Sequence, residues 1–346
     1  MKALVLHAPG DLRLEERPDP VPGPGEALLR IRASGICGSD IARVMTKGTY
    51  SFPMIPGHEF AGEVVSLGPG TDPSLLGRTC AAFPLLPCRA CDSCAIGEYA
   101  ACRSYDYFGS RRDGGFAELL AVPAWNLVPA PDGLSFEEAA MAEPAAVALH
   151  ALRRGGLSAG DDTGVAGAGP VGLLLAAWAR VGGSRRVFLW DIDPRRVAFA
   201  RSLGHDRAFD SRETDPVEAI REATGGRMLD LAVEGAGVSA TLEQCLRAAR
   251  PGGVVVAMGH PAGAMTLSRE GYWEILRKQL DLRGTWNSSY TDLPKNEWKL
   301  VLETMADGRL DTKPFITHRL RLEDGPEAFR TLLARSEFSN KVMFLP

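Results

Sequence analysis

The sequence predicts an α/β protein in which a β-rich first domain precedes a doubly wound, parallel sheet of six strands. At 346 residues the chain exceeds the usual size of a single hydrophobic core, so two domains are expected. Up to about residue 150 it is rich in Gly and Pro, with β-branched segments such as 27–33 and 63–67, which is typical of small strands and turns. Beyond about residue 160, short apolar runs alternate with segments of helical period, the pattern of βαβ units.

Local signals locate the elements of the second domain. Its expected strands end near Ala166, Asp191, Phe209, Val233, Met258 and Thr285. Asp193 and Asp215, each followed by Pro, are expected to cap helices by accepting hydrogen bonds from free N–H groups. An amphipathic segment at 297–307 and an apolar strand at 341–345 should return to the first domain. The expected boundaries are therefore 1–149 with 287–346 for the first domain, and 150–286 for the second.

The composition excludes several classes of protein. The chain has 39 basic and 43 acidic residues, too little positive charge for a general nucleic-acid-binding surface. No apolar run approaches the roughly 18 residues that span a bilayer, and the N-terminus soon becomes charged. We therefore expect a cytoplasmic protein with no nucleic-acid or membrane partner. An odd number of cysteines, seven, without a secretion signal favours reduced thiols and metal ligation over disulfides.

A cluster of cysteines predicts a closed metal site. Cys88, Cys91, Cys94 and Cys102 form a CxxCxxCx7C array in a segment without helical or strand periodicity. Four thiolates are common ligands of tetrahedral structural zinc, and they leave no open position for a substrate. Cys80, in an apolar strand, and Cys245, on an expected helix, are interpreted as core thiols.

A glycine motif after the first strand of the second domain predicts a dinucleotide site. The segment GAGPVG contains Gly167, Gly169, Pro170, Val171 and Gly172, and it leads into an apolar helix. The glycines let the backbone approach a pyrophosphate, which binds at the helix N-terminus. Asp191 follows at the spacing of about twenty residues that suits contact with ribose hydroxyls, so NAD is favoured over NADP. Arg196 could instead attract a 2′-phosphate, and Gly164 is expected to weaken the strand before the motif.

A second set of potential metal ligands is scattered along the chain. It comprises Cys37 in GICGSD, His58 and Glu59 in PGHEF, and Glu143 in AEPAAVALHA. Each of these residue types, taken alone, is more often structural than ligating. However, GICGSD, GHEFAGEVVSLG, the cysteine array, GAGPVG and WDID occur together and in this order. In this respect the chain resembles, over its whole length, the zinc-dependent medium-chain alcohol and polyol dehydrogenases.

The resemblance implies a GroES-like catalytic domain and a Rossmann domain, with two Zn²⁺ per chain and NAD as cofactors. It implies that Cys37, His58 and Glu143 bind a catalytic zinc that keeps one open position, and that Glu59 lies beside the metal as an exchanging ligand. It also makes Ser39 the acceptor of the substrate's hydroxyl proton, whereas the relay histidine of many relatives is replaced by Ala42. A homodimer or homotetramer formed through the edge of the nucleotide-binding sheet is implied as well.

Within the family, the segments PLLPC, YDYFGSRRDGGFAE and WNSSY resemble members that act on galactitol 1-phosphate. The implied reaction is oxidation of a secondary alcohol of a polyol phosphate to a ketose phosphate. Candidate substrate-binding residues are Arg43, Lys47, Tyr50, Arg111, Arg112, Trp286, Asn287 and Tyr290, for which a solvated surface or core packing is an equal alternative. Other candidate functions are oxidation of an unphosphorylated polyol such as sorbitol, oxidation of another secondary alcohol such as L-threonine, and NAD binding without catalysis.

Overall fold

The chain forms two compact units. A computed structural model describes residues 1–261 and 263–346. Unit 1 comprises Met1–Pro144 and Ser289–Pro346, and unit 2 comprises Ala145–Ser288. Across the described residues, every helix is too short or too polar for a membrane crossing.

Unit 2 is built on the predicted parallel sheet. Its strands are β10 (Asp162–Ala166), β11 (Arg186–Asp191), β12 (Ala208–Asp210), β13 (Leu229–Glu234), β14 (Ala249–Ala257) and β15 (Asp281–Gly284). They lie in the order β12-β11-β10-β13-β14-β15, and each neighbouring pair is parallel. The chain therefore starts in the middle of the sheet and winds out to both edges. In such a sheet the loops at the carboxyl ends of the first and fourth strands border the usual nucleotide site.

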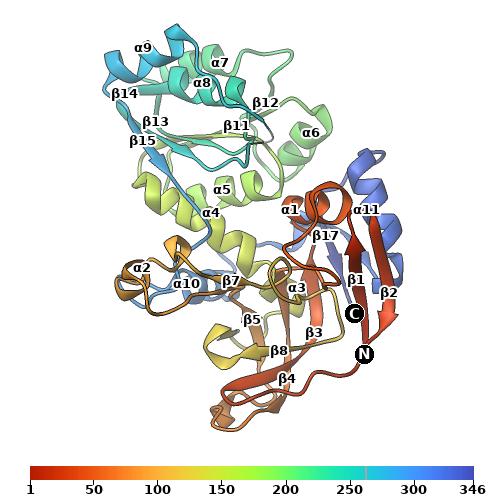
Figure 1. Ribbon diagram of the computed structural model, residues 1–346. Helices are drawn as coiled ribbons and strands as arrows, with labels where there is room; N and C mark the ends of the chain where they lie inside the picture. The colour runs from red at the N-terminus through yellow and green to blue at the C-terminus, as the bar shows by residue number, and fades with distance from the viewer. Residues whose placement is uncertain (262) are drawn as a thin grey trace. The chain divides into compact units, whose positions relative to one another are not determined.

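Helices cover both faces of this sheet. They are α5 (Pro170–Val181), α6 (Pro194–Ser202), α7 (Pro216–Thr224), α8 (Ser239–Ala248) and α9 (Arg269–Lys278). Helices α7, α8 and α9 pack together on one face, and α5 and α6 lie on the other (Figure 1). Asp193 and Asp215 cap α6 and α7, because each carboxylate accepts a hydrogen bond from the backbone N–H two residues later.

The glycine in β10 has a packing role. A Cβ atom at Gly164 would lie 2.4 Å from Leu229 Cδ1 and 3.1 Å from the Trp190 ring. Trp190 is fully buried, and its indole N–H donates to Gln244 Oε1 at 2.8 Å. Gly164 therefore makes room for a large aromatic side chain in the core of unit 2.

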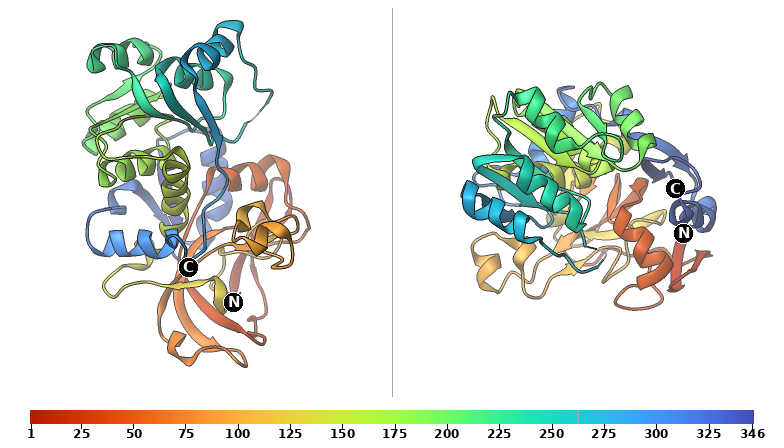
Figure 2. Two further views of the ribbon diagram at one scale, coloured as in Figure 1. Left: turned by 90° about the vertical axis from the view of Figure 1, so that its left-hand side faces the viewer. Right: turned by 90° about the horizontal axis from the view of Figure 1, so that it is seen from above.

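Unit 1 is built on a mostly antiparallel sheet drawn from both ends of the chain. Its strands are β3 (Glu26–Gly35), β4 (Glu59–Leu67), β5 (Thr79–Ala82), β8 (Leu119–Pro123), β9 (Leu127–Pro129), β16 (Ile316–Leu320) and β17 (Lys341–Phe344). The order is β16-β17-β3-β4-β5-β9, with β8 also paired to β3. The C-terminal strand β17 thus lies beside β3. The two chain ends, marked N and C in Figure 2, both lie in this unit.

Smaller elements complete unit 1. They are the hairpin β1 (Lys2–Ala8) and β2 (Asp11–Glu16), the two-stranded pair β6 (Leu85–Leu86) and β7 (Asp106–Tyr107), and helices α1 (Gly38–Ala42), α2 (Asp92–Ala95), α3 (Phe136–Ala140), α10 (Glu297–Ala306) and α11 (Gly325–Ala334). Helix α4 (Ala142–Gly155) begins in unit 1 and continues into unit 2. Side chains of β1, α11 and β17 form one apolar cluster, so both chain ends contribute to the same core.

A buried carboxylate stabilises the unit 2 sheet at the amino-terminal end of its central strand β10. Asp162, at the start of β10, is fully buried and accepts hydrogen bonds from Arg186 at 2.6 and 2.8 Å and from Arg185. Burial opposes ionisation, but these guanidinium groups prevail and lower the pKa of Asp162 to about 2. Charge pairing rather than exposure therefore keeps this group ionised.

We predict that Asp162→Asn lowers the free energy of unfolding of unit 2 by about 2 kcal/mol near pH 7. Because the folded pKa lies below its ordinary value of 3.8, the contribution is present above pH 4 and is lost as the pH falls toward 2. Urea unfolding of both proteins at several pH values measures this difference. A difference that stays constant from pH 7 to pH 2 would contradict the assigned pairing.

Candidate active site

Two strands bring a thiol, an imidazole and a carboxylate together in unit 1. Cys37 follows the end of β3 and caps α1. Glu59 is the first residue of β4, and His58 directly precedes it. Because β3 and β4 are antiparallel and pair Gly35 with Glu59, the end of one strand meets the start of the other. The ligand atoms of Cys37, His58 and Glu59 lie within 4.8 Å of one another.

Asp40 fixes the orientation of His58. The Asp40 carboxylate is fully buried; it lies 3.1 Å from His58 Nδ1 and accepts the Cys37 N–H at 3.0 Å. Burial opposes protonation of His58, but Asp40 prevails and raises the pKa of the ring above its ordinary value. Since Asp40 occupies Nδ1, the opposite nitrogen, Nε2, is left for a metal ion, a common arrangement around metal-ligating histidines.

A lysine from the C-terminal strand holds Glu59. Lys341 Nζ donates to Glu59 Oε2 at 2.6 Å and to the Ile36 carbonyl at 3.2 Å, and both side chains are at most 2% exposed. A Cβ atom on Gly35 would come within 2.3 Å of the same carboxylate oxygen. Glu59 therefore lies over a glycine and is neutralised by a cation from a distant part of the sequence.

Glu143, the third predicted ligand, lies at the start of α4 in the same environment. It is 5% exposed, and Tyr107 Oη donates to its Oε1 at 3.4 Å. Burial, together with the neighbouring Glu59 charge, raises the pKa of Glu143 to about 7 although His58 opposes the shift. The compact group of ligand atoms contains Glu59 rather than Glu143, so two buried carboxylates border this site.

The four predicted cysteines also lie together. Their sulfur atoms are all within 4.8 Å, with separations of 3.6 Å for Cys91 and Cys94 and 3.9 Å for both Cys88–Cys94 and Cys91–Cys102. Zinc–sulfur bonds of about 2.3 Å in a tetrahedron place the sulfurs about 3.8 Å apart. None of the chain's cysteines forms a disulfide. The cluster therefore has the dimensions of a closed zinc site.

Local hydrogen bonds prepare part of this cluster for metal binding. The backbone N–H groups of Arg103 and Cys94 lower the pKa of Cys91 to about 6, whereas burial raises the pKa of Cys94 to about 12. Zinc binds thiolates, so binding would release the proton of Cys94. The predicted core thiols Cys80 and Cys245 are buried outside the cluster.

In unit 2 the glycine motif forms the turn between β10 and α5. Gly167 has a positive φ of 105°, and a Cβ on Gly172 would lie 1.9 Å from the Gly167 carbonyl oxygen. Gly169 caps α5, and Pro170 and Val171 lie in its first turn. A Cβ atom added at Gly169 would lie 3.7 Å from Arg196 Nη1, its nearest neighbour among the described residues outside the adjoining segment. The helix N-terminus is thus open to a phosphate group.

Asp191 lies at the end of β11 beside this turn. Its carboxylate accepts hydrogen bonds from the N–H groups of Ala168 at 2.8 Å and Asp193 at 2.9 Å. Arg196 Nη1 lies 3.4 Å from the same carboxylate, so part of the Arg196 charge is balanced. This arrangement suits an acceptor for ribose hydroxyls.

Ser39 and Arg43 belong to the network around His58. Arg43 Nη1 donates to Asp40 Oδ1 at 2.8 Å and to Ser39 Oγ at 3.1 Å. Arg43 therefore links the predicted proton acceptor to the residue that orients His58, and its charge is compensated by a buried carboxylate. This contact makes Arg43 a positioning group for Ser39 and Asp40.

The other predicted substrate-binding residues have different surroundings. The Arg111 guanidinium lies against the Tyr50 ring, and Arg112 lies over Phe108 and 3.9 Å from Asp106. Tyr290 stacks on Phe83 at 4.3 Å and donates to the Trp125 carbonyl, so it packs in the core of unit 1. Trp286 and Asn287 belong to unit 2, where Trp286 is exposed and lies 6.4 Å from the His260 ring. Lys47 is exposed.

Sequence reasoning missed three residues of the site: Asp40, Tyr107 and Lys341. Asp40 lies within GICGSD, so its closeness to Cys37 was a local signal. The Tyr107 ring lies 5.7 Å from the His58 ring, but its place in the sequence gives no sign of this. Lys341 lies in an apolar segment, where a buried lysine requires a charged partner that only the fold reveals.

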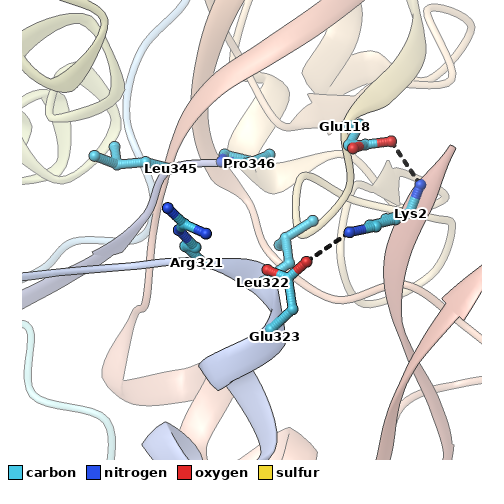
Figure 3. Close-up of a pocket in the computed structure, with 7 residues that line it drawn as sticks. All are labelled: Lys2, Glu118, Arg321, Leu322, Glu323, Leu345 and Pro346. Carbon is cyan, nitrogen blue, oxygen red and sulfur yellow. Dashed lines mark hydrogen bonds and ion pairs between the residues drawn. The ribbon is translucent and has the colours of Figure 1, made fainter.

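Surface cavities occur away from these groups. The cavity in Figure 3, about 270 Å³, is lined by Lys2, Glu118, Arg321, Leu322, Glu323, Leu345 and Pro346. Lys2 Nζ donates to Glu323 at 2.7 Å there, while the Lys2 backbone N–H donates to Glu118. The lining has two acidic and two basic side chains and includes no predicted site residue, so this cavity is not assigned a function.

The combination of a GroES-like sheet, a doubly wound nucleotide-binding sheet and two zinc-type ligand clusters defines a class of zinc-binding oxidoreductases. Residues 23–132 match the family described as alcohol dehydrogenase GroES-like domain, and residues 170–307 match zinc-binding dehydrogenase. The chain belongs to this zinc-dependent alcohol dehydrogenase family. It is accordingly an NAD-dependent oxidoreductase that acts on CH–OH groups.

Relatives within the family act on sugar alcohols and their phosphates. The chain is 33% identical to galactitol 1-phosphate 5-dehydrogenase of Escherichia coli over the full length of both, and the crystal structure of that protein superimposes with a TM-score of 0.93. It is 32% identical to sorbitol dehydrogenase of Bacillus subtilis, over 100% of this chain and 97% of the relative. A dehydrogenase structure from Sinorhizobium meliloti bound to NADP is 28% identical, with a TM-score of 0.91 over 100% and 99% of the two chains.

The ion pair at Lys341 yields a stability prediction. Lys341→Met should lower the free energy of unfolding by roughly 3 to 5 kcal/mol, because Glu59 is left as a buried, unpaired charge. The double variant Lys341→Met/Glu59→Gln should recover part of this loss. Urea unfolding measures both, and Lys47→Met, at an exposed lysine, is the control. Equal midpoints for Lys341→Met and the unaltered protein would exclude a structural role for the pair.

Proposed function

We propose that this protein oxidises a secondary alcohol of a polyol phosphate, of the galactitol 1-phosphate type, to the corresponding ketose phosphate. The gathering of Cys37, His58 and two buried carboxylates in unit 1 carries the oxidation of an alcohol, and the 33% identity to galactitol 1-phosphate 5-dehydrogenase supports the phosphorylated substrate. When bound, zinc would supply a Lewis acid for the alcohol oxygen, and NAD would supply the hydride acceptor.

The proposed ligands of the catalytic zinc are Cys37, His58 and Glu143. Glu59 already pairs with Lys341 at 2.6 Å, whereas Glu143 is buried with a hydrogen bond from a neutral tyrosine. A divalent cation would therefore stabilise the charge of Glu143 more than that of Glu59. Glu59 stands next to the ligands as the exchanging carboxylate. Three protein ligands leave the fourth position to the substrate.

The chain's own residues orient the substrate and move its proton. Ser39 accepts the hydroxyl proton of the substrate, while Arg43 holds the Ser39 oxygen at 3.1 Å. Ser39 then passes its own proton to a hydroxyl of the cofactor ribose or to water, since Ala42 provides no imidazole for a relay. Asp40 keeps the His58 ring in place by its contact with Nδ1.

Cys88, Cys91, Cys94 and Cys102 are proposed to hold a second, structural zinc, which gives two Zn²⁺ per chain. The turn from Gly167 to Gly172 and the carboxylate of Asp191 are proposed to bind NAD. Asp191 would repel a 2′-phosphate, and its contact with Arg196 reduces the attraction of that arginine for one. Seven free cysteines suit a reducing compartment, so we propose that the protein works in the cytoplasm.

Two other substrates are the alternatives to a polyol phosphate. The relative that acts on sorbitol is 32% identical, so an unphosphorylated polyol is the nearest alternative, followed by another secondary alcohol such as L-threonine. Membership of the dehydrogenase family argues against the third candidate, an NAD-binding protein without catalysis.

Steady-state NADH formation from galactitol 1-phosphate, galactitol, sorbitol and L-threonine tests the proposal. We expect the highest kcat/KM with the phosphorylated polyol, and a higher value with NAD than with NADP. A preference for galactitol or sorbitol would replace the proposed substrate, and absence of turnover of all four compounds by the zinc-loaded protein would refute the proposed reaction.

Two cysteine variants separate the zinc sites in the same assay. Cys37→Ser should reduce kcat by at least about 10³-fold and lower the zinc content from about two to about one per chain, with little change in thermal stability. Cys91→Ser should also remove one zinc but should lower the melting temperature, because its site closes a loop. Zinc is measured by mass spectrometry. Activity retained in Cys37→Ser would refute the catalytic assignment.

A homodimer or homotetramer is proposed through the exposed edge of the unit 2 sheet. Strand β15 is an edge strand of the sheet, and its Leu282 is 49% exposed. Three apolar side chains on α9 are exposed to a similar extent, namely Tyr272, Trp273 and Leu276. Exposed edge strands and apolar patches favour self-association. Light scattering should give a multiple of the monomer mass, and Leu282→Glu should reduce it; a monomeric unaltered protein would overturn this proposal.

A further inference from the structure

We propose that Arg111, which lies between the rings of Tyr50 and Tyr105, binds the phosphate group of the substrate. This contact determines the preference of the enzyme for a phosphorylated over a free polyol. This inference rests on the proposed oxidation of a polyol phosphate. The sequence contains four basic candidates for this role: Arg43, Lys47, Arg111 and Arg112. They differ in the partners that their side chains already have, and these partners favour Arg111.

The surroundings of Arg111 cover the faces of its guanidinium and leave donors at the edge. Its Cζ atom lies 4.4 Å from the centroid of the Tyr50 ring and 4.4 Å from that of Tyr105. Nη1 donates to the Tyr105 carbonyl at 3.0 Å, and Nη2 to Tyr50 Oη at 3.4 Å. A guanidinium carries five N–H donors in one plane, so donors remain for a bidentate contact with phosphate oxygens.

Arg111 also keeps its positive charge uncompensated. In the described part of the chain, no carboxylate forms an ion pair with it, whereas Arg43 pairs with Asp40 at 2.8 Å and Arg112 lies 3.9 Å from Asp106. A phosphate monoester carries close to two negative charges at neutral pH. An arginine already neutralised by a carboxylate would bind such a group less strongly than one whose charge is free.

Rigidity separates Arg111 from Lys47. Lys47 is exposed at the end of the π-helix Arg43–Lys47, with no ring or carboxylate contact in the described residues, so anion binding would have to immobilise its flexible side chain. Arg111, by contrast, already has contacts with two tyrosine rings and two hydrogen bonds, which restrict its side chain. A preorganised guanidinium therefore loses less entropy when it binds an anion.

Ring contacts connect Arg111 to the proposed zinc ligands within unit 1. The centroids of the Tyr105 and Tyr107 rings are 6.3 Å apart in an edge-to-face arrangement with an interplanar angle of 73°, and the Tyr107 ring lies 5.7 Å from the His58 ring. Tyr107 also donates to Glu143. In a polyol phosphate the anionic group lies several carbons from the reacting hydroxyl, so its anchor should be near the metal ligands without touching them. Arg111 satisfies this requirement.

The experiment compares galactitol 1-phosphate with galactitol in the zinc-loaded enzyme and its variants. Arg111→Gln should reduce the ratio of kcat/KM for the phosphorylated to the free substrate by roughly 10- to 100-fold, mainly through KM, as expected for the loss of a charge-assisted contact. Arg111→Lys should recover part of the ratio. The controls Arg112→Gln and Lys47→Gln should change it by less than about threefold.

Other outcomes overturn the inference in distinguishable ways. If the Tyr50–Arg111–Tyr105 stack is only structural, Arg111→Gln will lower stability and affect both substrates equally, so the ratio will not change. If Lys47→Gln or Arg112→Gln lowers the ratio instead, the phosphate is bound elsewhere. If the unaltered enzyme prefers free galactitol or lacks turnover, the proposed function itself fails, and Arg111 loses this role for a different reason.

Discussion

The candidate active site of unit 1 depends on how the charges of its buried side chains are paired. A buried carboxylate is costly unless a cation or hydrogen-bond donors compensate it. Asp40 has His58 and Arg43, and Glu59 has Lys341. Glu143 has no such partner at ion-pair distance among the described residues, and its pKa rises to about 7. The remaining deficit of positive charge, beside the Cys37 thiol, is of the kind that a divalent cation would supply.

The register of one strand pair creates this balance. Antiparallel pairing of Gly35 with Glu59 brings the segment after β3 to the start of β4, and β17 pairs with β3 next to the same point. Residues separated by 282 positions, Glu59 and Lys341, therefore form a direct ion pair. The four-cysteine cluster arises differently, because its ligands lie within one short loop and need no long-range pairing. A change in sheet register would disrupt the first group and leave the second largely intact.

This difference also explains how far the sequence could predict the structure. The six-strand sheet of unit 2, its caps at Asp193 and Asp215 and the turn at GAGPVG follow from local period and capping chemistry, and all were predicted. Cys37, His58 and Glu143 were selected only because their motifs resemble a family in a fixed order. Lys341 and Tyr107 carry no local signal, since their roles come from partners that tertiary pairing provides. Gly164 shows the same limit, because the sequence does not reveal that Leu229 and Trp190 fill the space a side chain at this position would need.

The proposed preference for a phosphorylated substrate depends on the same principle of charge balance. The number of basic residues in the segments near the proposed metal ligands does not identify an anion site, because Arg43 and Arg112 already have carboxylates within 4 Å. The proposed anion site is instead marked by a cation that has no counterion and whose side chain is already restricted. The tyrosines on either side of Arg111 cover its faces without neutralising it, since aromatic rings attract a cation but carry no net charge. Relatives that share the zinc ligands can therefore differ in substrate through a residue that does not contact the metal.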